Sequence, residues 1–111
     1  MVSYFLALPN QPTLTGPSVV KYGSTNEWTC ISTGGKPAPT MTMRIGNSMF
    51  TSGTASKTVL QSDNTYTVSS VLSWSPSMAY HGQSLYCDVQ YQEAGETDLK
   101  TDSLLLTIYC T

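Results

Sequence analysis

The sequence predicts an all-β domain built as a sandwich of two antiparallel sheets. Its 111 residues are 40% hydrophobic but only 11% charged, and the formal net charge is −2. This length fits one domain, and the composition is too apolar and too weakly charged for a disordered segment. Turn-forming residues recur at short intervals, and no helical periodicity is sustained between them. The short segments between turns alternate apolar and polar residues, which is typical of half-buried strands.

Five segments show this alternation most clearly: residues 28–32, 41–45, 71–74, 85–91 and 104–108. In the first segment Trp28 and Cys30 are predicted to point inward together. In the others the apolar residues occupy every second position and therefore share one face. The more polar stretch 51–63 is expected to be an edge region with a weak strand near 58–60. Seven or eight such strands, each buried on one side, form a two-sheet sandwich.

Three cysteines, at positions 30, 87 and 110, add a further constraint. Cys30 and Cys87 each occupy an inward position in the middle of a predicted strand, far apart in the sequence. This placement favours a disulfide between the two sheets, which would restrict the unfolded chain by roughly 4 kcal/mol in the loop-entropy account. The alternative is a pair of reduced, buried thiols, as expected in the cytosol.

Two strands with buried cysteines in this order are the arrangement of immunoglobulin domains. The run CISTGGKPAP followed by TMTM, the run SVLSWSP followed by HGQSLYC, and the closing LLLTIYC resemble the constant-like second domain of nectins, nectin-like molecules and the poliovirus-receptor group. FLALPNQP resembles the junction from a preceding domain. The resemblance implies a Greek-key, immunoglobulin-like sandwich with an inter-sheet disulfide. It also implies a junction over residues 1–10 and a constant-type domain over residues 11–110.

Two positions depart from the family pattern. Met43 stands where the family has a core tryptophan that packs on the disulfide. Trp28 or Trp74, both predicted to point inward, would fill that volume while flexible methionines adapt around it. The alternative for Trp28 is a surface position in a contact patch. Leu85, also expected in the core, stands where many immunoglobulin domains have a corner tyrosine, a loss that the nectin-like subset shares.

Several function classes find no support in the sequence. The basic residues form no patch for nucleic acid, and no apolar run approaches the roughly 18 residues that membrane insertion needs. The single histidine, His81, lies in a predicted turn without a nucleophile signature, so we assign no catalytic residues and expect no enzyme. No cofactor motif or metal-ligand set is present. Glu93, Glu96, Asp98 and Asp102 are interpreted as a solvated acidic loop rather than a calcium site.

Binding to proteins remains as the function. The outward positions of the central strands would form a face that mixes aromatic and polar groups, as contact surfaces do. This candidate binding face comprises Thr42, Arg44, Tyr86, Asp88, Gln90, Thr107 and Tyr109. Plain solvent exposure would produce a similar pattern, so the sequence leaves that alternative open.

The resemblance implies an extracellular module of a cell-surface, single-pass adhesion or recognition receptor. Its expected partners are protein ligands, including homophilic or heterophilic immunoglobulin-like receptors, and neighbouring immunoglobulin domains. No secretory signal is visible at the start of the sequence, so Met1 is interpreted as an added start residue or an internal boundary. One alternative is a module of a secreted immune-type binding protein. Another is an intracellular structural immunoglobulin domain, whose cysteines would stay reduced.

Cys110 is the odd cysteine of the three. It follows the last predicted strand, several residues beyond any register that reaches Cys30 or Cys87, and a disulfide needs Cα atoms within about 7 Å. An odd cysteine in a secreted chain indicates an outside partner or a reactive thiol. We expect a partner on a following domain or a second chain, with a free, exposed thiol as the alternative.

Overall fold

The computed structural model describes residues 7–93 and 96–110, apart from the side chains of residues 93 and 96. More than half of the expected junction over residues 1–10 therefore lies outside the described residues. The described part of that segment lies against the end of the third strand. Ala7 forms an isolated antiparallel bridge with Lys36, and the Asn10 N–H donates to the Thr33 carbonyl at 2.8 Å.

Strands make up most of the described chain. In order they are β1 Thr13–Thr15, β2 Val19–Lys21, β3 Asn26–Gly35, β4 Thr40–Ile45, β5 Ser48–Met49, β6 Thr54–Leu60, β7 Tyr66–Trp74, β8 Ser84–Glu93, β9 Glu96–Leu105 and β10 Thr107–Tyr109. A single 3₁₀ turn, η1 at Met78–Tyr80, is the only helix within the described ranges. No helix there is long and apolar enough to cross a membrane.

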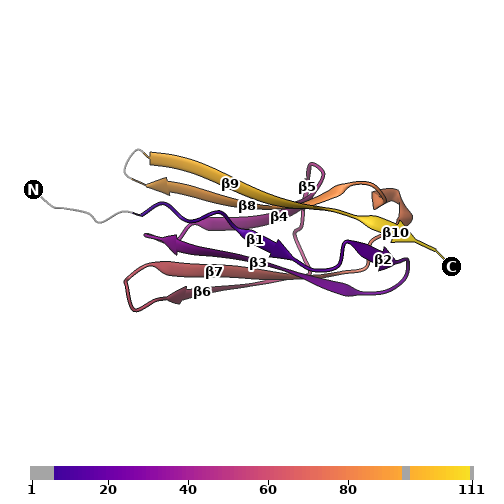
Figure 1. The fold of residues 1–111 in the computed structure, drawn as a ribbon, viewed down its shortest axis with the longest axis horizontal. Coiled ribbons are helices and arrows are strands. Elements are labelled where there is room, and N and C mark those ends of the chain that lie inside the picture. Colours follow the sequence, from indigo (N-terminus) through magenta and orange to yellow (C-terminus); the bar gives the residue numbers. More distant parts are fainter. Residues whose placement is uncertain (1–6, 94–95, 111) are drawn as a thin grey trace, which may run out of the picture.

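The strands form two four-stranded antiparallel sheets stacked face to face, as Figure 1 shows. One sheet has the order β1-β3-β7-β6 and the other the order β5-β4-β8-β9. Neighbours such as β3 and β7 come from distant parts of the sequence, as Greek-key connections require. The predicted all-β sandwich is confirmed.

The core lies between the sheets and is centred on a disulfide. Cys30 on β3 and Cys87 on β8 are bonded, with Cα atoms 6.4 Å apart, so the alternative of two reduced thiols is wrong. Met43 lies directly opposite Cys87 in the β4–β8 ladder. The buried cluster comprises Leu14, Val20, Trp28, Cys30, Met43, Ile45, Leu72, Leu85, Cys87, Val89, Leu106 and Ile108.

Four aromatic side chains pack together in and against the core. Trp28 is fully buried, so the surface alternative for this residue is wrong. Trp74 is partly buried and packs beside Trp28, with ring centroids 6.0 Å apart. Phe50 and Tyr80 make edge contacts with Trp74 at centroid distances of 4.9 and 5.2 Å. The four rings form one cluster centred on Trp74, and the packing of a tryptophan on the disulfide in place of the family residue stays a prediction.

A parallel pair, β2 with β10, departs from the predicted purely antiparallel sandwich. Between β1 and β2 the chain passes Gly16 and Pro17 and leaves the first sheet. Gly16 has φ 146°, and a Cβ atom there would lie 2.5 Å from Cδ1 of Trp28. Trp28 Nε1–H donates to the Pro17 carbonyl at 2.8 Å. The buried indole of Trp28 therefore contacts the crossover between β1 and β2 directly. The local sequence pattern does not predict this contact, because the two segments are separate in the sequence.

The closing strands begin earlier than the sequence predicts. The sequence predicts a solvated acidic loop at Glu93, Glu96, Asp98 and Asp102 and a strand at 104–108, but β9 pairs with β8 from residue 96 onward. The inward positions of β9 carry Asp98, Lys100 and Asp102, and these charges obscure the apolar alternation. Asp98 forms a salt bridge with Lys100, and Asp102 Oδ2 accepts the Leu14 N–H at 2.8 Å. Asp98 and Asp102 therefore lie on a strand rather than in an acidic loop.

Candidate protein-binding surface

The outer face of the β5-β4-β8-β9 sheet carries most of the predicted binding residues. Burial of Met43 and Cys87 turns the neighbouring positions on β4 and β8 outward. Arg44 then lies opposite Tyr86 across the ladder. We call this surface the β4–β8–β9 face; it comprises Thr42, Arg44, Met49, Tyr86, Asp88, Gln90, Leu99, Thr101 and Leu105.

Arg44 organises the centre of this face. Its Nε donates to Asp88 Oδ2 at 2.6 Å, and its Nη1 donates to the Gly46 carbonyl at 2.6 Å. Its Cζ lies 4.0 Å from the centre of the Tyr86 ring, which is a cation–π contact. Thr101 Oγ1 donates to Asp88 Oδ1 at 2.7 Å. The hydrogen bond to Asp88 raises the pKa of Arg44, so the guanidinium stays charged at physiological pH.

The network orders side chains more than it stabilises the fold. The side chains of Arg44 and Asp88 remain 27% and 18% exposed, and a solvent-accessible pair of this kind contributes only about 0–1 kcal/mol. Each side chain is nevertheless held in one geometry by several contacts. A partner that binds here would lose less side-chain entropy than on a surface of free side chains.

Apolar side chains lie around this polar centre. Met49, Leu99 and Leu105 are exposed by 62%, 63% and 60% of their surface. None of these three side chains is among the residues expected on the face from the sequence, although the period-2 alternation, extended back along 97–105, places the two leucines outward. Exposed apolar groups beside ordered polar groups are the composition of protein contact surfaces.

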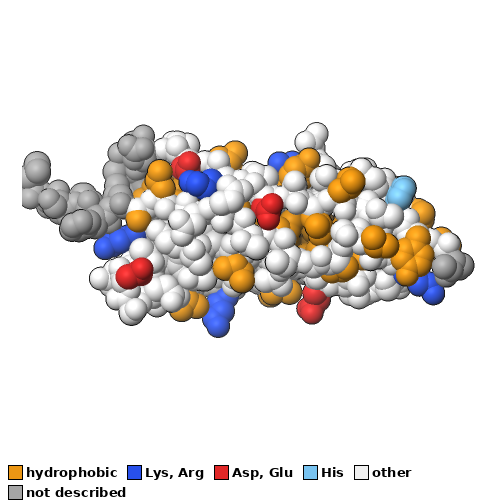
Figure 2. All heavy atoms as spheres, in the orientation of Figure 1, with side chains coloured by type: hydrophobic (Ala, Val, Ile, Leu, Met, Phe, Trp, Pro, Cys, Tyr) orange, Lys and Arg blue, Asp and Glu red, His pale blue; other side chains and the backbone are white. Residues whose placement is uncertain are grey.

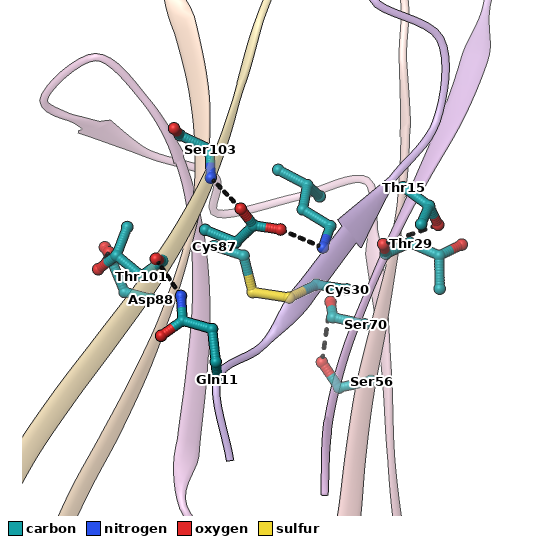
Figure 3. Close-up of a disulfide and its surroundings, with 12 residues drawn as sticks. Gln11, Thr15, Thr29, Cys30, Ser56, Ser70, Cys87, Asp88, Thr101 and Ser103 are labelled. Carbon is teal, nitrogen blue, oxygen red and sulfur yellow. Dashed lines mark hydrogen bonds between the residues drawn. A yellow bond between two sulfur atoms is a disulfide. The ribbon is translucent and has the colours of Figure 1, made fainter. Parts of the chain in front are cut away.

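Gln11 and the edge strand β1 contact β9 at the side of the sandwich, as Figure 3 shows around the disulfide. Gln11 Nε2 donates to the Thr101 carbonyl at 2.6 Å. The Asp102 carboxylate accepts both the Leu14 N–H and, at 2.9 Å, the Ser103 N–H. These bonds close the side of the sandwich where β1 and β9 are the edge strands. They hold Thr101, and through it Asp88, in place.

The other predicted face residues divide between two sheets. Gln90 is exposed and lies opposite Thr40 on β4 and Leu99 on β9, on the same face as Asp88. Tyr109 lies on β10, where its register partner is Lys21 of β2. Thr107 belongs to the same parallel pair. The structure thus brings Thr42, Arg44, Tyr86, Asp88 and Gln90 together and assigns Thr107 and Tyr109 to a separate ladder.

Other reactive side chains have structural roles or stand alone. His81 Nδ1 accepts the Ile108 N–H at 3.0 Å and so holds β10 beside η1. Cys110 is exposed and unbonded. Among the described residues, no three His, Cys, Asp or Glu side chains lie together as a metal ion would need. On the side shown in Figure 2 the charged side chains are scattered, without a continuous patch of either sign.

Comparison with solved structures gives several close matches in fold. The crystal structure of Rst D1-D2 matches with a TM-score of 0.78 at 23% identity, covering 91% of this chain and 49% of that one. The full ectodomain (Ig1-Ig3) of mouse nectin-like molecule 4 gives 0.76 at 16% identity, covering 94% and 35%. Bovine butyrophilin gives 0.70 at 16% identity, covering 90% and 44%. The chain therefore spans half or less of each of these proteins.

Sequence comparison identifies the family. No curated protein sequence matches the chain. The family of CD80-like C2-set immunoglobulin domains, in contrast, matches residues 6–97, a stretch that includes both disulfide cysteines. The appearance of nectin-like molecule 4 among the similar structures agrees with the resemblance seen in the sequence. The chain belongs to the CD80-like C2-set family of immunoglobulin domains.

Proposed function

We propose that this chain is an extracellular module of a cell-surface adhesion or recognition receptor and that it binds protein ligands through the β4–β8–β9 face. The observation that carries the proposal is the centre of that face, where Arg44, Tyr86 and Asp88 are held together in one arrangement. The exposed side chains of Leu99 and Leu105 beside it add apolar contact area. Surfaces of this composition and order are those that protein partners use.

The disulfide supports the extracellular location. Disulfides persist in oxidising compartments and are rare in the cytosol, so the intracellular structural alternative is disfavoured. A secreted binding protein remains as the second candidate. The multidomain structures that share this fold support neighbouring immunoglobulin domains. We accordingly assign residues 1–10 to a junction and residues 11–110 to the domain, with partners among immunoglobulin-like receptors of the same or another kind.

The proposal is tested by measuring binding of the domain to cell surfaces in a multivalent fusion, because avidity makes weak single-site binding measurable. Two variants change the face: Leu99→Glu, which places a charge on an apolar position, and Arg44→Gln, which breaks the central network. Both positions are solvent-accessible, so both variants should fold normally. The matched control is Val19→Glu, an exposed apolar position on β2 outside the face.

We expect both face variants to lose at least about tenfold in apparent affinity, as central interface positions do. Val19→Glu should bind like the unmodified domain. If all three variants bound as well as the unmodified domain, any ligand site would lie outside the β4–β8–β9 face. A complete lack of binding to a broad panel of cells would contradict an adhesive role and leave the domain as a spacer.

A further inference from the structure

The outer face of the other sheet has a different character from the β4–β8–β9 face. On β3, β7 and β6 the outward side chains are threonine, serine or small and β-branched apolar groups, with two charged exceptions. We call this surface the β3–β7–β6 face; it comprises Glu27, Thr29, Ile31, Ala55, Lys57, Val59, Thr67, Ser69, Val71 and Ser73. Ile31 is 43% exposed. Covering this face desolvates only two charges, and its hydroxyl groups need hydrogen-bond partners within the contact.

The two charges lie on the two outer strands of this face, on either side of β7. Glu27 is opposite Ser73 on β7, and Lys57 is opposite Ser69 on the other side of the same strand. Val71 lies midway, two residues along β7 and one strand across from each. With strands about 4.8 Å apart and about 3.3 Å per residue, the two charged positions are about 16 Å apart and symmetric about Val71.

Both charges are available to a partner. Among the described residues neither Glu27 nor Lys57 forms a salt bridge. Ser73 Oγ donates to Glu27 Oε2 at 3.2 Å, which orients the carboxylate without neutralising it. Lys57 lies on the edge strand β6, and its ladder partner on β7, Ser69, is not acidic.

We propose that the β3–β7–β6 face binds a second copy of this chain. Two copies stacked face to face, about a two-fold axis in the interface plane, form a self-complementary contact of the kind found in symmetric dimers. When the axis passes through Val71, perpendicular to the Glu27–Lys57 diagonal, Glu27 of each copy lies over Lys57 of the other. Ile31 lies close to this axis. An apolar centre is therefore flanked by two equivalent ion pairs.

The same geometry predicts how the sheets cross and how strongly they bind. The strands of the two copies cross at about 70°, closer to the orthogonal than to the aligned class of sheet packing. The contact is only three strands wide, so it buries less than the roughly 1,200 Å² of a stable complex. We expect dimers at concentrations of about 100 μM and above, and less dimer at high salt because exposed ion pairs are screened.

Sedimentation equilibrium up to about 1 mM protein measures this association. All samples carry Cys110→Ser, so that no intermolecular disulfide contributes. Lys57→Glu and Glu27→Lys each place like charges against one another, and each should weaken the dimer by at least about tenfold. The double variant, with both charges exchanged, should restore dimerisation. Ile31→Glu should also abolish the dimer, through repulsion near the two-fold axis rather than at the two ion pairs.

Two control variants establish that any loss of dimer comes from this face. Lys21→Glu makes the same charge change as Lys57→Glu but on β2, and Leu99→Glu alters the β4–β8–β9 face; both should dimerise normally. Amide NMR spectra establish that each variant is folded. A monomer at every concentration and salt level would overturn the proposal. So would a double variant that dimerises no better than the single variants, because Glu27 and Lys57 would then not face each other.

Discussion

Replacing Trp28 by alanine tests whether this residue joins the core to the β1–β2 crossover. The side chain is fully buried, and large-to-small replacement of a buried aromatic residue costs about 3–5 kcal/mol. The indole N–H also donates to the Pro17 carbonyl, and losing that bond adds about 1 kcal/mol. Domains unfold with about 5–15 kcal/mol in total, so Trp28→Ala should leave the protein marginally stable.

Guanidinium unfolding, followed by far-ultraviolet circular dichroism, gives the measurement. With a slope of about 3–4 kcal/mol/M for a domain of this size, the midpoint should fall by more than about 1 M in Trp28→Ala. Trp28→Phe keeps most of the buried ring but loses the N–H donor, so its midpoint should fall by less than half as much. A change below about 0.3 M in Trp28→Ala would refute the role assigned to the indole.

Gly16 provides an independent check on the same contact. A Cβ atom at this position would lie 2.5 Å from Trp28 Cδ1, and its φ of 146° disfavours side chains. Gly16→Ala should therefore destabilise the domain by more than about 1 kcal/mol. In the Trp28→Ala background the clash with the indole is absent, and the backbone strain and the close approach to the Glu27 carbonyl, 3.0 Å away, remain, so the cost should fall. Costs that simply add would show that Gly16 and Trp28 do not interact.

Two further predictions concern the chain end and a turn. Cys110→Ser should remove any disulfide-linked dimer from a non-reducing gel without changing the melting temperature, because Cys110 is exposed and unbonded; unfolding of this variant would contradict that assignment. Hydrogen bonds from Thr65 lower the pKa of Asp63 below its usual 3.8. This stabilisation is present above the unfolded-state pKa and is lost as pH falls through the folded-state value. In Thr65→Ala, carboxylate NMR titration should show the Asp63 pKa rising.

The sandwich and its core could be predicted because burial there follows the local alternation. Trp28, Cys30, Met43, Leu85 and Cys87 all lie at positions that strand periodicity turns inward, and all five are buried. The disulfide follows from two inward cysteines on distant strands. At the β4–β8–β9 face the same periodicity places Arg44 and Asp88 outward. It does not reveal that they touch, because that depends on the register between β4 and β8.

Features missed from the sequence depend on contacts between distant segments. The inward face of β9 carries Asp98, Lys100 and Asp102, and only pairing at the sheet edge and with the β1 backbone makes these charges acceptable there. The parallel β2–β10 ladder likewise depends on the crossover that Trp28 holds. Tyr109 was assigned to the binding face because the alternation continues through residue 106. The change of ladder partner, from β8 to β2, leaves no trace in that alternation.

The two proposed surfaces lie on opposite sides of one rigid unit and can be used together. The Cys30–Cys87 disulfide fixes β3 against β8, so burying the β3–β7–β6 face leaves the β4–β8–β9 face unchanged. In the proposed dimer both copies of the ligand-binding face point away from the contact. A weak dimer would then present two binding faces at once and raise apparent affinity for a clustered ligand without any new contact. For the free domain, without a multivalent fusion, Ile31→Glu should accordingly weaken binding to cells only at concentrations at which the unmodified domain dimerises. Leu99→Glu should weaken this binding at every concentration.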